Sequence, residues 1–143
     1  MTVKAILSRK GTDVVTVEPK ASLTETVKML ASKRIGAVVV TGADRRVIGI
    51  LSERDIVRAI GERGPQVLDE TVDSVMTRKV VTCAEADTVA AIMERMTAGK
   101  FRHLPVVEDG RLAGIISIGD VVKSRLEEIE KESEALKEYI LTA

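Results

Sequence analysis

The hydrophobic positions of the chain alternate between short apolar runs and longer stripes at helical spacing, and this succession occurs twice. Short runs rich in β-branched residues are typical of strands. Between them, apolar residues three or four positions apart predict helices that bury one face. A hydroxyl residue precedes each helix, and Ser22 with Glu25 has the form of a capping box. The segments expected to be strands are 14–17 and 35–40 in the first copy and 80–83 and 101–107 in the second.

Each copy ends in the same short motif. The pattern Gly-x-x-Ser-x-x-Asp occurs at residues 49–55 and again at residues 114–120, displaced by 65 positions. In both places it closes an apolar strand, and a helix is expected to begin near the aspartate. Two copies of this length are too few for a solenoid. We therefore expect an α/β (α+β) fold made of two β-α-β-β-α repeats, with the motifs at related corners.

Residues rich in glycine and proline at 61–66 mark the connection between the repeats. The segments 6–8 and 73–77 are expected to open the first and the second repeat. The expected divisions are a first repeat at 1–64, a second repeat at 65–123 and a C-terminal helical tail at 124–143.

The tail carries apolar or small residues at alternating intervals of four and three positions, which is typical of a coiled-coil seam. The pattern predicts one amphipathic helix over residues 120–141. The stripe spans barely three heptads, so a free-standing coiled coil would be marginal. Docking on a second subunit and docking on the chain's own module both remain open. The residues of the stripe are Val122, Leu126, Ile129, Ser133, Leu136 and Ile140.

Composition narrows the classes of partner and location. The 143 residues include 22 basic and 22 acidic side chains, so the net charge is zero, which argues against broad binding of nucleic acid. Phe101 and Tyr139 are the only aromatic residues, which leaves no platform for stacking bases. The sequence lacks an apolar stretch of membrane-spanning length and the apolar core of a signal peptide. The expected location is therefore the cytoplasm.

Cys83 is the only cysteine, which excludes an internal disulfide and suits a reducing compartment. We interpret it as a small buried hydrophobe, with a redox role as the alternative. Catalytic patterns are absent: the sequence has neither the ligand spacing of a metal site nor a Gly-x-x-x-x-Gly-Lys loop. Gly-x-Ser-x-Gly is absent too, and His103 is the only histidine. We therefore expect a sensor and not an enzyme.

The motifs resemble a tandem pair of cystathionine-beta-synthase (CBS) domains, often called a Bateman module. The resemblance rests on Ser-Val-Met-Thr at 74–77, Phe-Arg-His-Leu-Pro-Val-Val at 101–107 and the two Gly-x-x-Ser-x-x-Asp motifs. It covers roughly residues 2–125. The first repeat departs from the family pattern, because its middle strand lacks the proline and the basic pair. More narrowly, the chain looks like the small stand-alone bacterial proteins that hold little besides the module.

The resemblance implies that the repeats pack pseudo-symmetrically through their sheets, with two clefts between them, and that modules pair into homodimers. AMP, ADP and ATP are the commonest ligands of such clefts, and S-adenosylmethionine and NAD(H) also occur. Binding would signal through a conformational or oligomeric change to an unidentified protein target. The alternative is a dimerising scaffold with vestigial pockets, in which the C-terminal helix carries the function.

The family motif gives each candidate binding residue a role. The aspartates would accept hydrogen bonds from ribose hydroxyls, the serines would contact ribose or phosphate, and the cationic residues would meet the phosphates. The threonines would contact the purine or the ribose. The structural alternative is that the aspartates only cap helices and the basic residues have no ligand. The candidate nucleotide-binding residues are Thr16, Ser52, Arg54, Asp55, Thr82, Arg102, His103, Ser117 and Asp120.

The two clefts are not expected to be equivalent. Arg102 and His103 interrupt the middle strand of the second repeat, whereas glycine and alanine stand at the matching positions of the first. Arg54 can compensate for this loss in the first motif. We therefore expect at least one cleft to bind poorly or to prefer another ligand. Asp120→Ala is expected to weaken nucleotide binding more than Asp55→Ala.

Overall fold

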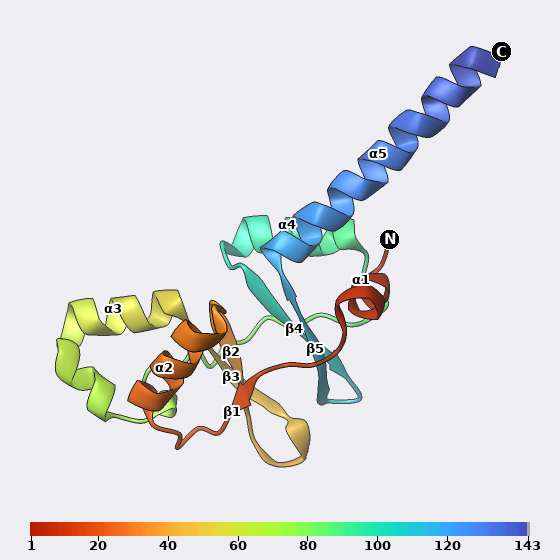
Figure 1. Ribbon diagram of the computed structural model, residues 1–143. Coiled ribbons are helices and arrows are strands. Elements are labelled where there is room, and N and C mark those ends of the chain that lie inside the picture. The colour runs from red at the N-terminus through yellow and green to blue at the C-terminus, as the bar shows by residue number, and fades with distance from the viewer. Residues whose placement is uncertain (143) are drawn as a thin grey trace.

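The computed structural model describes residues 1–142 and shows two lobes, each built on a small sheet (Figure 1). In the first lobe β1 pairs with β2 in parallel, and β2 pairs with β3 antiparallel. The predicted order β-α-β-β-α is therefore confirmed in this lobe. Its elements are β1 (Thr16–Val17), α2 (Leu23–Lys33), β2 (Ala37–Thr41), β3 (Val47–Ser52) and α3 (Glu53–Arg63).

The second lobe repeats this order without a regular first strand. Its strands β4 and β5 pair antiparallel. The strand predicted at 80–83 is wrong, because in the described part of the chain this segment contributes a single parallel bridge, between Cys83 and Val106. Val80 and Val81 line a cavity instead. The elements of the lobe are α4 (Val89–Gly99), β4 (His103–Glu108), β5 (Arg111–Ser117) and α5 (Ile118–Thr142).

Hydroxyl residues cap the helices that follow the first strand positions. Ser22 Oγ accepts a hydrogen bond from Glu25 N at 3.2 Å, and Thr88 Oγ1 accepts one from Ala91 N at 3.1 Å. Each bond satisfies one of the backbone donors that are free at a helix start. These caps fix where α2 and α4 begin. Short 3-10 helices occupy the connections η1 (Ala43–Arg45), η2 (Pro65–Asp69) and η3 (Val72–Ser74).

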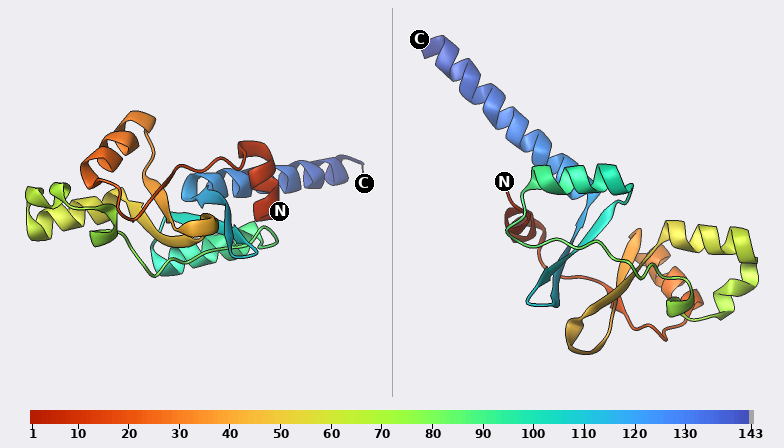
Figure 2. Two further views of the ribbon diagram at one scale, coloured as in Figure 1. Left: turned by 90° about the horizontal axis from the view of Figure 1, so that it is seen from below. Right: turned by 180° about the vertical axis from the view of Figure 1, so that it is seen from behind.

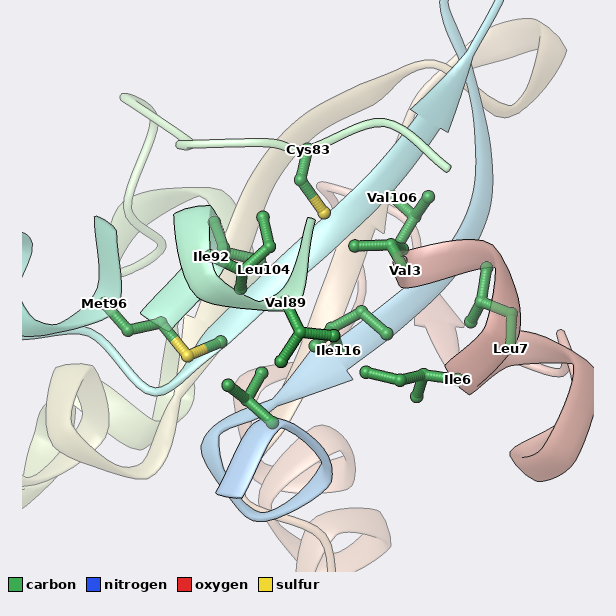
Figure 3. Close-up of a cluster of buried hydrophobic side chains, with 11 residues drawn as sticks. Val3, Ile6, Leu7, Cys83, Val89, Ile92, Met96, Leu104, Val106 and Ile116 are labelled. Carbon is green, nitrogen blue, oxygen red and sulfur yellow. The ribbon is translucent and has the colours of Figure 1, made fainter. Parts of the chain in front are cut away.

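The core of the second lobe is completed by the N-terminal helix α1 (Val3–Lys10). Figure 3 shows Val3, Ile6 and Leu7 facing the side chains of β4 and β5. Leu7 packs so closely on β5 that a Cβ added to Gly114 would lie 2.8 Å from Leu7 Cδ2. Only glycine at this position lets α1 approach the strand.

The core of the first lobe is completed from the second half of the chain. Val72 is fully buried there, and Met76 packs on β3, where a Cβ added to Gly49 would lie 2.5 Å from Met76 Sδ. The segments predicted to open each repeat therefore pack on the other repeat. The boundary between residues 64 and 65 separates the two repeats along the sequence. In the structure, however, each lobe includes core residues from both sides of this boundary.

Cys83 lies in the core of the second lobe, and burial raises the pKa of its thiol to about 12. Because the thiolate is the reactive form, we expect the folded protein to resist iodoacetamide at mildly alkaline pH. Mass spectrometry of the intact chain measures the modified fraction, and the same reaction in denaturant is the control. Rapid modification of the folded chain would contradict this and favour the redox role.

The first turns of α5 are anchored on the second lobe. Val121 and Ser124 are buried, and the Met1 ammonium lies 3.2 Å from Glu128 Oε1. Arg9 of α1 forms an ion pair with a glutamate of the same turn, Glu127. These contacts fix the direction in which α5 leaves the body of the molecule.

Beyond these turns α5 points into solvent (Figures 1 and 2). Every side chain from residue 129 to residue 142 is exposed. The single helix predicted for 120–141 is therefore confirmed, and its docking on its own module stops at residue 128. Across residues 1–142, each helix falls short of the length or the apolar character needed to cross a membrane.

Candidate functional site

The two Gly-x-x-Ser-x-x-Asp motifs fold into the same corner, where a strand ends and a helix begins. Ser52 Oγ accepts a hydrogen bond from Asp55 N at 3.3 Å, and Asp55 Oδ2 accepts one from Ser52 N at 2.9 Å. Ser117 and Asp120 make the same two bonds at 3.2 and 2.9 Å. The serine is thus the helix cap, and the aspartate turns back to the serine N–H, as in a capping box.

The second oxygen of Asp55 meets a hydroxyl from the other half of the chain. Thr77 Oγ1 donates a hydrogen bond to Asp55 Oδ1 at 2.9 Å. Thr77 is held in place by two backbone bonds, since Thr77 N donates to Ile50 O at 2.8 Å and Ile50 N donates to Thr77 O at 3.0 Å. This pairing with β3 brings the carboxylate and the hydroxyl together at the contact between the lobes.

A cavity of about 460 Å³ opens beside the Asp55 corner and takes its lining from both lobes. The corner supplies Ser52, Arg54 and Asp55, and the segment that enters β4 supplies Arg102 and His103. We call it the Asp55 cavity. It brings together residues from the two repeats that the sequence predicts as binding residues.

Further lining residues of the Asp55 cavity were missed by the sequence reasoning. Arg58 lies one helical turn after Arg54 on α3, so its spacing was a usable signal. Lys79 stands two residues after the Ser-Val-Met-Thr segment, whose pattern indicates the family but not a binding role for this lysine. Lys100 gave no signal, because it stands at the exposed end of α4 and reaches the cavity only through the packing of the lobes. The missed lining residues with polar side chains are Glu53, Arg58, Thr77, Lys79 and Lys100.

The lining of the Asp55 cavity is mainly cationic. Among the described residues, five lining side chains are arginine or lysine, against the carboxylates of Glu53 and Asp55. Arg54 Nη1 donates a hydrogen bond to Lys100 O at 2.9 Å, which ties α3 to the end of α4. Such a cavity favours an anionic ligand, because charge-assisted hydrogen bonds are the stronger ones.

His103 stands between the two corners. Across the β4–β5 ladder it is in register with Ser117, and a Cβ added to Gly36 would lie 3.5 Å from His103 Cε1. Burial lowers the pKa of His103, although Glu53 opposes the shift. The ring is therefore mostly neutral at pH 7 and offers one donor and one acceptor in place of a fixed positive charge.

The Asp120 corner differs because a lysine occupies it. Lys10 Nζ lies 2.7 Å from Asp120 Oδ2 and donates a second bond to Ile115 O at 3.0 Å. Burial alone would raise the pKa of Asp120, but the hydrogen bonds from Lys10 and Ser117 bring that pKa below its ordinary value. The first corner presents its carboxylate to a hydroxyl, whereas the second has already neutralised its carboxylate with an ammonium group.

The geometry places the basic pair of the second repeat beside the corner of the first repeat. Arg102 and His103 line the cavity that contains Asp55, because the approach of the lobes at Gly36 places the start of β4 over the first corner. Thr16 lies instead beside a separate hollow at residues 16–20 and 41–43. Thr82 is exposed, and its carbonyl accepts a hydrogen bond from Arg95, so neither threonine lines the Asp55 cavity.

Comparison with known proteins identifies the repeats. The family model described as CBS domain matches residues 3–62 and 72–127. A CBS-domain containing protein from Agrobacterium tumefaciens is similar in structure, with a TM-score of 0.84 and 54% identity over 87% of this chain and 99% of that one. Curated relatives are longer, and the match spans 70%, 58% and 39% of three of them.

Two further similar structures contain ligands. A CBS domain protein from Pyrobaculum aerophilum, complexed with AMP, has a TM-score of 0.74 and 30% identity over 84% of this chain and 89% of that one. A CBS domain pair in complex with 5-methylthioadenosine and S-adenosyl-L-methionine has a TM-score of 0.77 and 27% identity over 91% of this chain and 98% of that one. Since the family model covers both repeats, the chain belongs to the CBS-domain family as a tandem pair of CBS domains.

Proposed function

We propose that the chain is a regulatory module of the cytoplasm that senses AMP, ADP or ATP in the Asp55 cavity. The observation that carries this proposal is the meeting of a carboxylate, hydroxyl groups and five cationic side chains in one cavity. A nucleotide offers the complementary groups, namely a cis-diol for the carboxylate and anionic oxygens for the cations. The similar structures solved with AMP and with S-adenosyl-L-methionine support a ligand that contains adenosine.

The ribose fits best at the carboxylate of Asp55. Its Oδ2 atom is engaged within the corner, but Oδ1 accepts from the Thr77 hydroxyl, which can rotate toward a ligand. The purine would lie against Ile50, Val80 and Val81, because aliphatic walls can bury a flat ring. The phosphates would then extend toward the cationic part of the lining.

We infer that the Asp120 corner binds a nucleotide poorly or prefers another ligand. A ribose diol at Asp120 would have to displace the ammonium of Lys10, which holds both the carboxylate and a backbone carbonyl. An ionised donor binds a carboxylate more strongly than a neutral hydroxyl does. Arg54 has no counterpart here, since Gly119 stands at the matching position.

A ligand in the Asp55 cavity would touch both lobes at once, which suits a sensor. It would bridge the α3 corner of the first lobe and the segment before β4 of the second. Because a ligand shifts a conformational equilibrium only if it binds one state more tightly, contacts to both lobes would favour one angle between them. The output would pass to a second copy of the chain and to an unidentified protein target.

Calorimetric titration with AMP, ADP, ATP, S-adenosylmethionine and NADH tests the proposal. We expect the adenine nucleotides to bind below millimolar concentration, with close to one strong site per chain. Added salt should weaken the binding, because it screens the cationic lining. S-adenosylmethionine should bind more weakly, since it carries a sulfonium cation into a cationic cavity.

Absence of binding by all five compounds below millimolar concentration would contradict sensing of an adenosine ligand. The dimerising scaffold with vestigial pockets would then be favoured. Binding of S-adenosylmethionine or NADH in preference to the nucleotides would instead reassign the ligand and keep the sensor.

A further inference from the structure

Helix α5 carries an apolar stripe that its own chain leaves exposed, and we call this stripe the α5 seam. Two of its leucines, Leu126 and Leu136, are 56% and 59% exposed. The buried residues Val121 and Ser124 lie on a different face of the helix, about 100° and about 160° around its axis from the centre of the seam. The residues of the α5 seam are Val122, Leu126, Ile129, Ser133, Leu136 and Ile140.

A helix end of this kind needs a partner. Residues 129–142 are exposed at every position, so these turns of α5 gain no stability from packing on their own chain. In proteins most of the stability of a helix comes from packing of its apolar face. The alternation of four and three places the seam at the a and d positions of heptads, with Leu126, Ser133 and Ile140 at a. A second helix packed along the seam would cover the apolar side chains and stabilise the turns beyond the body.

The charges beside the seam select the partner and its direction. In a parallel pair in register, a g position faces the following e position of the other helix. Arg125 would then meet Glu130 of the second copy, and Glu132 would meet Lys137 of the second copy. Each of these contacts joins opposite charges, and two-fold symmetry repeats each contact.

An antiparallel pair of helices would not join opposite charges beside the seam. If each a position of one helix lies opposite a d position of the other, centred on the middle of the seam, then e positions face e positions and g positions face g positions. Glu130 would meet Glu130, Glu132 would meet Glu132, and Lys123 would meet Lys137. Like charges in these places are destabilising.

We propose that α5 pairs with the same helix of a second copy as a parallel, in-register, two-stranded coiled coil. The modules of the two copies then lie at the same end of the coil, since each packs on the N-terminal turns of its own helix. The family model ends at residue 127, so most of this seam lies outside the matched CBS repeats. Pairing through α5 requires no ligand, so its test is independent of the proposed nucleotide sensing.

Cysteine cross-linking of the full-length chain tests the pairing and its direction together. In the parallel coil Ile140 lies against Ile140 of the second copy, whereas the antiparallel register would place it against Val122. Ile140→Cys should therefore form disulfide-linked dimers at least about tenfold faster than the control Leu141→Cys, because pairing raises the local thiol concentration. Leu141 is more exposed than Ile140 and lies off the seam, and Cys83 is buried. Equal rates for the two variants would overturn the proposal.

Charge-reversal substitutions beside the seam provide a second test of the parallel register. In the Ile140→Cys background, Glu132→Lys alone creates lysine–lysine contacts and Lys137→Glu alone creates glutamate–glutamate contacts, so each should cross-link more slowly. A mixture of the two variants should cross-link preferentially as heterodimers, because both contacts are then attractive. Lys131→Glu, at the outward f position, is the matched control and should leave the rate unchanged. Cross-linking that ignores these exchanges would overturn the parallel register.

Discussion

Replacing Asp55 by alanine is expected to weaken the binding of AMP, ADP and ATP by roughly 10- to 150-fold, or about 1.5–3 kcal/mol. The carboxylate lines the Asp55 cavity and meets the Thr77 hydroxyl there, so its loss removes the charged acceptor proposed for the ribose. Asp120→Ala should have a much smaller effect, since Lys10 already holds that carboxylate. Isothermal titration of the two variants and the unaltered chain measures the difference.

Asp120→Ala is a close structural match for the comparison. Each substitution deletes one capping-box bond of 2.9 Å to a serine N–H. Each also removes one bond to another element, from Thr77 at Asp55 and from Lys10 at Asp120, so both should lower the folding stability. Thermal unfolding of both variants shows whether they remain folded at the temperature of the titration. A loss of affinity at Asp120 that equals or exceeds the loss at Asp55 would contradict the assignment of the site.

This ranking reverses the one that follows from the sequence, and Lys10 explains why. In the sequence Arg102 and His103 belong to the same repeat as Asp120, which predicts more basic side chains near Asp120 than near Asp55. Contacts within one repeat can be inferred from a local pattern, but the pair of Lys10 and Asp120 joins residues 110 positions apart. Its existence depends on the packing of α1 on the second lobe.

The parts of the fold that follow local rules were predictable from the sequence. Ser22 and Thr88 cap their helices where the hydroxyl precedes the apolar stripe, and the two corners form at the repeated motif. The strand at 80–83 was not correctly predicted, because the β-branched run there faces the Asp55 cavity and bridges β4 at only one position. The resemblance supplied the packing through the sheets, which periodicity alone does not give.

The repeated corner of the candidate site was predictable from the sequence, whereas the full positive charge of the cavity was not. Arg54, Arg102 and His103 stand inside motifs and could be nominated. Lys79 and Lys100 are exposed, and lysine is a common residue at exposed positions, so their residue type carries no signal. Only the approach of the lobes turns these side chains into part of one cationic cavity.

Replacing Leu7 by alanine is expected to lower the free energy of unfolding by about 2–5 kcal/mol. Leu7 is 4% exposed, belongs to the core of the second lobe, and fills the space that Gly114 leaves open on β5. Because small domains have only about 5–15 kcal/mol of stability in total, this would be a large fraction. Urea unfolding with linear extrapolation measures the change.

Lys4→Ala is the matched control, because Lys4 lies on the same helix but is exposed. It should change the stability by no more than about 0.5 kcal/mol. Hydrogen exchange then shows which elements are destabilised. Leu7→Ala should lower the protection of backbone amides in α4, β4 and β5 more than in β2 and β3. Greater loss of protection in the first lobe would show that α1 stabilises the repeat to which it belongs in sequence. Such a result would contradict the packing of α1 on the second lobe, and therefore the contact between Lys10 and Asp120 that depends on it.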